Sequence, residues 1–334
     1  MAADAELSGG AAAGGGAAAG GGGATVGDAP ARGAGKTAAA AVSVASNSAL
    51  ILLKVAAGTI TGSVAILTEA LHSLIDLIAS LVAFFSVRKA DEPADADHPY
   101  GHEKIEHMAA AIEGMLILVG SGVIVFEAVR RLIEGGEVDQ LGFGIGVIAA
   151  SIAVNLVVST WLFARAKATG SPALEADAEH LRTDMVSSVG VLIGLVLVQT
   201  TDAQWVDPVV ALLVAGWISI AGLRILRQAS RVLVDEALPQ DELDAICEEV
   251  ATFAPRGVVG FHALRARRAG NHRYIDMHVQ FRAGTSLDDA HRMSHELQDA
   301  ILARLGNAEV LIHLEPEHRV RPDQGGLGGA FTPG

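Results

Sequence analysis

Six apolar blocks, each long enough to cross a lipid bilayer, dominate this sequence of 334 residues. A membrane-spanning helix needs about 20 predominantly apolar residues. Hydrophobic residues make up 51% of the chain and are concentrated in these blocks. The pattern predicts an integral membrane protein that begins with an all-α bundle of six transmembrane helices, over residues 38–60, 64–87, 105–133, 141–164, 174–199 and 205–226.

Lys and Arg are distributed unequally between the connections. The connections at 59–62, 135–140 and 200–204 contain neither residue. Those after the second and fourth blocks, and the segment after the sixth, carry Arg88, Lys89, Lys104, Arg165, Lys167, Arg224, Arg227 and Arg231. Because cytosolic loops are enriched in Lys and Arg, both termini are expected in the cytosol, with a bacterial-type inner membrane as the expected location.

The chain divides by composition into four parts. Residues 1–36 are almost entirely Ala and Gly, lack the basic start of a secretory signal, and predict a disordered cytosolic tail. The six-helix membrane domain follows over 37–233. A soluble domain is expected over 234–320, and a second Gly-rich disordered tail over 321–334.

The soluble part shows an α+β pattern. Helices are expected over 240–253 and 287–305, and strands over 258–267, 274–282 and 309–315. The second strand alternates apolar positions at Ile275, Met277, Val279 and Phe281. The order αββαβ predicts a small two-layer domain with helices on one face of a sheet.

Charge and composition exclude several functions. A formal net charge of −14 argues against a nucleic-acid partner, which requires a basic patch. Cys247 is the only cysteine, which leaves His, Asp and Glu to bind metal ions. No phosphate-binding glycine loop and no G-x-S-x-G or H-E-x-x-H motif is present, so an enzyme is not expected.

Two H-x-x-x-D pairs lie inside apolar blocks: His72 with Asp76, and His180 with Asp184. The i, i+4 spacing places both side chains of a pair on one helix face. Two such helices together offer four N/O ligands, a set that suits tetrahedral zinc. A single polar residue in a span could be a structural hydrogen-bonder, but two buried carboxylates are costly without a cation to neutralise them. The repetition favours an intramembrane metal site.

Other polar residues of the spans are less informative. Lys54 lies near the outer end of the first block, where it can snorkel to the interface. The other polar residues in or near the spans are Glu69, Glu113, Glu127 and Asn155. Each can face the bundle interior, a water-filled cavity or a helix end, and none is assigned as a ligand.

A second group of metal-ligand types lies in the loop PADADHPYGHEK. Asp95, His98 and His102 fall within eight residues, and Pro99 and Gly101 favour a turn between them. Three such ligands would leave one coordination position open. An acidic, solvated loop with incidental histidines is the alternative, and spacing alone does not decide between the two.

A third group of candidate ligands is scattered through the soluble domain. Its members are His262, His278, His291, His313 and Glu315. Sequence distance does not show whether they converge. The remaining histidines are interpreted as ordinary surface residues: His107, His272, His295 and His318.

These motifs together resemble the cation diffusion facilitator family, six-helix exporters of divalent metals that carry a cytosolic metallochaperone-like domain. The resemblance covers about 38–321. It is carried by the motifs HSLID at His72, PADADHPYGHEK at Pro93, HLRTD at His180, VDEALP at Val234 and IHLE at Ile312.

The resemblance implies a role for each group. His72, Asp76, His180 and Asp184 would form the transport site, and Asp95, His98 and His102 a loop site. His262, His278, His291, His313 and Glu315 would form cytosolic sites that bridge or stiffen a homodimer. Lys104 and Asp235 match a charge pair that ties the membrane and cytosolic parts of relatives together.

Two departures from the family pattern bear on the metal. Many bacterial relatives carry Asp where this chain has His72, and imidazole favours zinc over iron or manganese, with cadmium left open. Leu314 stands where some relatives offer a polar ligand, and Glu315 replaces a common Asp. These two changes leave the number of ions at the cytosolic site open.

The ligand types also suggest how transport is driven. Metal binding requires neutral His and ionised Asp, so protons and zinc compete for the same atoms. Imidazole titrates in the physiological range, which makes His72 and His180 the expected exchange groups. We therefore expect zinc/proton antiport by alternating access. The alternatives are an iron or manganese exporter and a membrane-anchored zinc receptor or scaffold that transports nothing.

Overall fold

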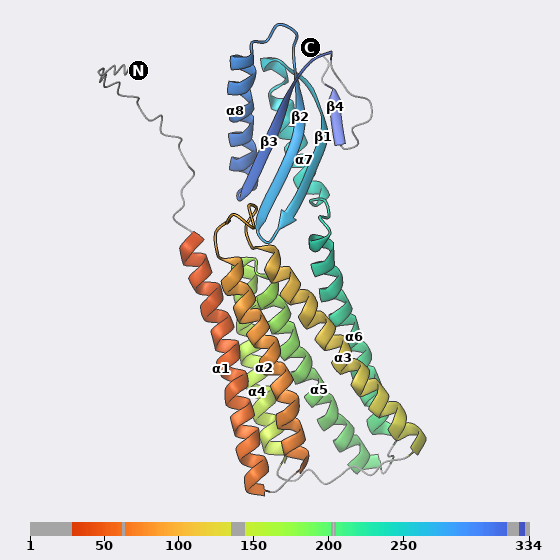
Figure 1. Cartoon of the computed structure of the whole chain (residues 1–334). Helices are drawn as coiled ribbons and strands as arrows, with labels where there is room; N and C mark the ends of the chain where they lie inside the picture. Colours follow the sequence, from red (N-terminus) through yellow and green to blue (C-terminus); the bar gives the residue numbers. More distant parts are fainter. Residues whose placement is uncertain are drawn as a thin grey trace, which may run out of the picture.

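The computed structural model describes residues 29–61, 64–134, 144–201, 203, 205–318 and 327–330. Within these ranges the chain forms a bundle of six long helices followed by a smaller α+β domain (Figure 1). The helices are α1 (Ala29–Thr61), α2 (Val64–Ala90), α3 (Lys104–Glu134), α4 (Gly144–Thr169), α5 (Pro172–Thr201) and α6 (Val206–Leu233). The predicted six-helix bundle is confirmed.

Four of these helices contain segments that are long and apolar enough to cross a membrane on their own, among the residues described. The segments are Gly35–Ala57, Lys104–Glu134, Ala149–Thr169 and Val206–Leu233. The other two helices, α2 and α5, carry the H-x-x-x-D pairs. The first half of α5 also contains Glu175, Asp177, Glu179 and Arg182, which lower its hydropathy.

The first helix begins earlier than expected. It starts at Ala29 and so includes 29–36, which the sequence assigned to the disordered tail. Alanine is the strongest helix former, and Pro30 is tolerated in a first helical turn. Lys36 donates to Glu106 of α3 at 2.8 Å, which ties this end of the helix to the bundle.

Helices α3 and α6 pack against each other and lean away from α1, α2 and α4 (Figure 1). Their contact is close because glycines face each other. A Cβ built on Gly114 would lie 3.2 Å from the Gly222 carbonyl oxygen, and a Cβ on Gly222 would lie 3.2 Å from that of Gly114. Small residues permit such close approach of membrane helices.

Polar side chains connect α1, α2 and α5 inside the bundle. Ser80 is hydrogen-bonded to Ser43 at 3.0 Å, accepts from Asn47 at 2.6 Å, and donates to Asp177 at 3.0 Å. Lys54 also points inward. Its side chain does not snorkel as expected, because it is buried and its Nζ donates to the Ser73 hydroxyl of α2 at 2.6 Å.

The C-terminal domain has the predicted αββαβ order. It contains α7 (Gln240–Thr252), a short 3-10 turn η1 (Ala254–Arg256), β1 (Val258–Ala269), β2 (His272–Phe281), α8 (Leu287–Leu305) and β3 (Ala308–Pro316). β1 and β2 form an antiparallel hairpin, and β2 and β3 pair in parallel. A parallel pair needs a long crossover, which α8 supplies.

A fourth strand, β4 (Leu327–Ala330), pairs antiparallel with β1 and gives the sheet order β3-β2-β1-β4. It falls in the segment that the sequence assigned to a disordered tail. Without β4, the edge of β1 that faces away from β2 would leave backbone N–H and C=O groups without partners. The short strand β4 pairs with some of these groups.

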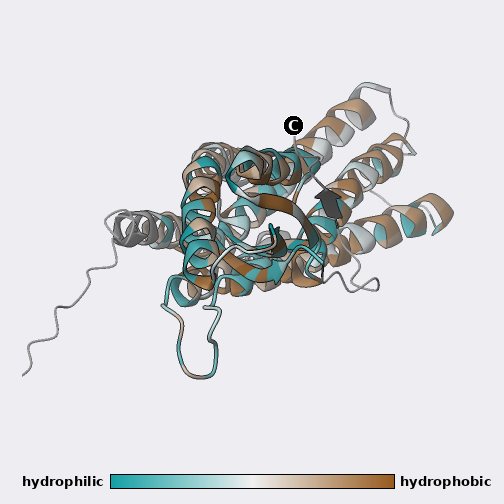
Figure 2. Cartoon of the chain, turned by 90° about the horizontal axis from the view of Figure 1, so that it is seen from above, coloured by the Kyte–Doolittle hydropathy of each residue, from teal (hydrophilic) through white to brown (hydrophobic). Residues whose placement is uncertain are grey.

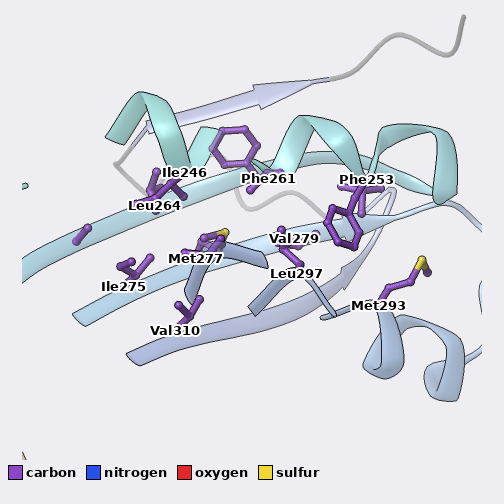
Figure 3. Packing of buried hydrophobic residues seen from close by; sticks show 14 of the residues in the cluster. Ile246, Phe253, Phe261, Leu264, Ile275, Met277, Val279, Met293, Leu297 and Val310 are labelled. Carbon is purple, nitrogen blue, oxygen red and sulfur yellow. The ribbon is translucent and has the colours of Figure 1, made fainter. Parts of the chain in front are cut away.

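The core of this domain lies between the sheet and its two helices. Ile275, Met277 and Val279 of β2 face Ile246 of α7 and Leu297 of α8 (Figure 3). Because side chains alternate along a strand, His278 lies on the opposite face of the sheet. Seen from above, hydrophobic residues line the membrane helices that spread from beneath this domain (Figure 2).

Candidate metal centres

Three predicted ligands of the membrane domain come together where α2 meets α5. One ligand atom each from Asp76, His180 and Asp184 lies within 4.8 Å of the others. His180 Nε2 is 3.4 Å from Asp76 Oδ1 and 3.8 Å from Asp184 Oδ2. The i, i+4 spacing on α5 places its two ligands on one face, and the packing of α2 brings Asp76 to them.

This intramembrane cluster is deeply placed. Asp76 is 8% exposed and His180 5%. Neither ring nitrogen of His180 has a hydrogen-bond partner of normal geometry among the described residues. Buried polar atoms are nearly always paired, so this donor set fits a bound cation. His72 lies in α2 one turn before Asp76, but its side chain is outside the described residues, and its place as fourth ligand stays a prediction.

The loop between α2 and α3 gathers its three predicted ligands. His98 Nδ1 lies 3.1 Å from Asp95 Oδ1, and His102 Nε2 lies 3.2 Å from Asp95 Oδ2. The ring centroids of the two histidines are 4.5 Å apart. The Gly101 N–H donates to the His98 carbonyl at 3.0 Å, closing a turn in which Gly101 has φ +81°. A glycine adopts this conformation without strain.

Asp95 is held in its ionised form. Desolvation acts to raise its pKa, but hydrogen bonds from the His98 backbone N–H and ring, together with the nearby His102, bring the pKa below its ordinary value. His102 is buried, whereas Asp95 and His98 are exposed. An anionic carboxylate at the surface, beside one exposed and one buried imidazole, can bind a cation that arrives from solution.

The third cluster lies on the sheet face away from the helices. His278 Nδ1 is 3.0 Å from Glu315 Oε1, and His262 Nε2 is 3.4 Å from Glu315 Oε2. The strand register explains this convergence, because His262 pairs with His278 and Gln280 pairs with Glu315. A register shift follows His262, where Ala263 has φ +52°. Such bulges redirect side chains and are common beside functional sites.

Of the other two predicted cytosolic ligands, His313 lies beside this trio and His291 lies apart from it. His313 is mostly exposed, with its Nε2 3.8 Å from Glu315 Oε1 and its ring 4.6 Å from that of His278. His291 lies on α8, which covers the opposite face of the sheet. Within the described part of one chain, His291 does not join His262, His278 and Glu315.

Lys104 and Asp235 are in contact, as the resemblance implied. Lys104 Nζ donates to Asp235 Oδ1 at 2.6 Å, and this hydrogen bond is the main cause of the lowered pKa of Asp235. Arg267 of β1 also donates to Asp235 at 3.1 Å.

The sequence did not indicate the aromatic residues around the Lys104 and Asp235 ion pair. The guanidinium of Arg267 lies 5.4 Å from the ring centroid of Tyr100 and 4.8 Å from that of Tyr274. The Tyr274 hydroxyl donates to the Tyr100 carbonyl at 2.8 Å. These are the two tyrosines of the chain, a rarity that could have drawn attention to them.

Two further carboxyl groups lie in the spans: Glu113, to which the sequence assigned no role, and Asp177, which the sequence did not indicate. Both are fully buried in the membrane bundle. Neither oxygen of Glu113 has a hydrogen-bond partner among the described residues. The membrane bundle therefore buries two carboxyl groups in addition to those of the intramembrane cluster.

Comparisons with known proteins agree with this arrangement. The cation efflux transmembrane domain matches residues 40–234, and the cytoplasmic domain of cation efflux proteins matches 238–317. An uncharacterized transporter of Synechocystis is 36% identical over 277 residues, covering 83% of this chain and 89% of the relative. The cation-efflux pump FieF of Yersinia pestis is 35% identical over 280 residues, covering 84% of this chain and 92% of the pump.

Solved structures are similar to about a quarter of this chain. The Zn form of CzrB is 32% identical, covers 26% of this chain and 99% of its own, and has a TM-score of 0.25. The metal-bound C-terminal domain of the CzcD transporter from Thermotoga maritima is 29% identical, covers 25% of this chain and 100% of its own, and has a TM-score of 0.22.

Proposed function

Because this chain belongs to the cation efflux family of transporters, we propose that it carries zinc out of the cytosol in exchange for protons. The cluster of Asp76, His180 and Asp184 inside the membrane bundle supports the proposal most directly. A receptor or scaffold that only senses metal would not need ligands at this depth, because burying carboxylates among apolar helices is costly.

The ligand types support zinc as the cargo. Two carboxylates and one imidazole, with His72 as the proposed fourth ligand, form a mixed N/O set. Such a set suits a borderline divalent ion better than a hard ion such as Mn²⁺, which prefers oxygen alone. Cadmium is the nearest chemical competitor, and an iron or manganese exporter is the alternative within the family.

Proton exchange follows from the chemistry of the same side chains. Zinc binds the neutral imidazole and the ionised carboxylates, so each proton that binds them opposes zinc. A site that opens alternately to the two sides would load zinc from the cytosol and release it to protons outside. The distribution of Lys and Arg supports a topology with both termini in the cytosol. The membrane would be a bacterial inner membrane.

The loop and sheet clusters would bind zinc on the cytosolic side. We assign Asp95, His98 and His102 to a loop site, and His262, His278 and Glu315, with His313 beside them, to a cytosolic site. The cytosolic domain would form the homodimer. Zinc that favours one arrangement of the two copies would shift their population and so regulate transport.

Flux measurements in proteoliposomes test the proposal. Under an imposed pH gradient, we expect the wild type to transport Zn²⁺ faster than Mn²⁺ or Fe²⁺, and Asp184→Asn to abolish zinc flux. Glu127→Gln is the matched control, since Glu127 pairs with Arg131 at the exposed end of α3. Undiminished flux in Asp184→Asn would reject the site, and zinc binding without any flux would favour the receptor.

A further inference from the structure

One buried carboxylate, Glu106 in the first turn of α3, connects the ends of four helices. Lys36 of α1 donates to Glu106 Oε1 at 2.8 Å, and the hydroxyl of Ser171, just before α5, donates to Oε2. Lys36 Nζ also lies 3.7 Å from Oδ1 of Asp91, which directly follows α2. We call these four residues the Glu106 cluster. None of them belongs to the three candidate metal centres described above.

The Glu106 cluster is shielded from solvent. Glu106 and Ser171 are 3% and 2% exposed, and the side chain of Lys36 is 15% exposed. A buried ion pair adds little net stability compared with a well-packed apolar contact, but the loss of one partner is costly because it leaves an uncompensated charge. Such a pair therefore favours the one arrangement of helices in which its partners meet.

The cluster joins two parts of the membrane bundle. Helices α3 and α6 pack closely through Gly114 and Gly222, and together they lean away from α1 and α2 (Figure 1). Glu106 connects this pair of helices to the ends of α1, α2 and α5. All of these contacts converge on one carboxylate and one ammonium group. A movement of α3 away from α1 and α5 at this end would break them together.

Ser171 links the cluster to the helix that carries two of the candidate metal ligands. Its hydroxyl accepts from the Leu174 N–H at 3.4 Å, in the first turn of α5. His180 follows Ser171 by nine residues, about 13.5 Å along a helix. Gly170, before Ser171, lies against Asn271 of the C-terminal domain, since a Cβ there would be 3.7 Å from Asn271 Cγ. The Glu106 cluster is therefore nearer to the C-terminal domain than the intramembrane cluster is.

We propose that the Glu106 cluster is a latch that closes the cytosolic approach to the intramembrane cluster and opens when zinc is loaded. This inference rests on the alternating access of the proposed function. With the latch closed, the ends of α1, α2, α3 and α5 are held together. Movement of α3 and α6 at this end would separate Glu106 from Lys36 and Ser171 and admit the ion. Weakening the latch should shift the population toward the state that is open to the cytosol.

Cysteine labelling measures this access without zinc and without transport. Asp184→Cys combined with Cys247→Ser places the only thiol at the intramembrane cluster. In proteoliposomes, a membrane-impermeant methanethiosulfonate is supplied either on the side of the C-terminal domain or on the opposite side. We expect Glu106→Gln in this background to raise the labelling rate from the domain side about tenfold or more, because losing one partner of a buried ion pair costs more than such a shift in population requires. Labelling from the opposite side should slow.

Three further variants make the test specific. Lys36→Arg keeps the ion pair and should label like the unaltered background. Ser171→Ala removes only a hydrogen bond to Glu106, so it should shift both rates in the same directions by a smaller factor, and it carries the test if Glu106→Gln does not fold. Glu127→Gln makes the same change of charge at the exposed end of α3 and should leave both rates unchanged.

The opposite response of the two sides separates a latch from a structural ion pair. The proposal is overturned if Glu106→Gln and Ser171→Ala leave both labelling rates unchanged, or if they raise both rates equally, as a general loosening of the bundle would. Because labelling is measured without zinc, these outcomes do not depend on whether the wild type transports it. Absence of zinc flux in the wild type would instead reject the proposed function.

Discussion

Lys104 and Asp235 form an ion pair at the boundary between the membrane bundle and the C-terminal domain, with Nζ 2.6 Å from Oδ1. Lys104 begins α3, and Asp235 follows the end of α6. Because α3 and α6 pack together, the pair connects the ends of these two helices that lie next to the C-terminal domain. Arg267 of β1 also pairs with this carboxylate, so Asp235 connects the end of α6 to both α3 and β1.

The energetic coupling of this pair should be small but measurable. The side chains of Lys104 and Asp235 are 33% and 49% exposed, so a double-mutant cycle with Lys104→Met and Asp235→Asn should give about 0.5–1 kcal/mol in the free energy of unfolding. The value should fall as salt is added. The more exposed pair Lys89 and Glu92 is the control. A coupling of zero at low salt would contradict this account of the junction.

Glu103 should make stability depend on pH. Burial, partly offset by Lys36, raises the pKa of this carboxyl to about 7. In the unfolded chain the group ionises near pH 4.5. Between these values the folded state binds the additional proton, so stability from this group falls as pH rises through the window and stays low above it.

Replacing Glu103 with Gln should remove this dependence. The stability of Glu103→Gln relative to the wild type should increase from about pH 4.5 to 7 and then level off. Thermal midpoints in detergent across this range measure the difference. A difference that does not vary with pH would show that Glu103 ionises normally in the folded protein.

Gly114 should not accept a larger side chain. A Cβ there would lie 3.1 Å from the Leu226 backbone nitrogen, and backbone cannot move aside easily. Gly114→Ala should lower the free energy of unfolding by about 1–3 kcal/mol. Gly120 of the same helix has nothing within 4 Å, so Gly120→Ala is the control and should be neutral or stabilising. Equal effects of the two substitutions would contradict the close α3–α6 contact.

Glu315 should be required for zinc binding at the cytosolic site. It lies next to both His262 and His278, so Glu315→Gln removes the only carboxylate of that trio. Zinc should then raise the thermal midpoint of the variant by less than that of the wild type, because a ligand that binds more weakly stabilises the folded protein less. Glu317→Gln changes a nearby carboxylate that accepts from the Ala283 N–H and should leave the zinc effect unchanged. If both variants respond to zinc like the wild type, the trio is not a zinc site.

Features with a local cause could be predicted from the sequence. Apolar blocks of spanning length gave the six helices, and the alternation of Ile275, Met277 and Val279 gave the buried face of β2. The i, i+4 spacing of His180 and Asp184 also placed both on one helix face, where the structure has them.

Features with a long-range cause could not be predicted in this way. The convergence of His262, His278 and Glu315 depends on strand register, and β4 pairs with β1 across some 60 residues of chain. Lys54 was expected to snorkel because it lies near the end of its block, but its hydrogen-bond partner Ser73 lies on another helix and only the packing of α1 against α2 brings the two together.

The most direct test of the central claim is to ask whether a zinc gradient alone drives protons across the membrane. Proteoliposomes with a pH-sensitive dye inside and equal pH on both sides would receive external Zn²⁺, with zinc and pH followed together. The account predicts that zinc entry alkalinises the interior, and that Asp184→Asn abolishes both signals. Zinc entry without any change of internal pH would contradict zinc/proton exchange.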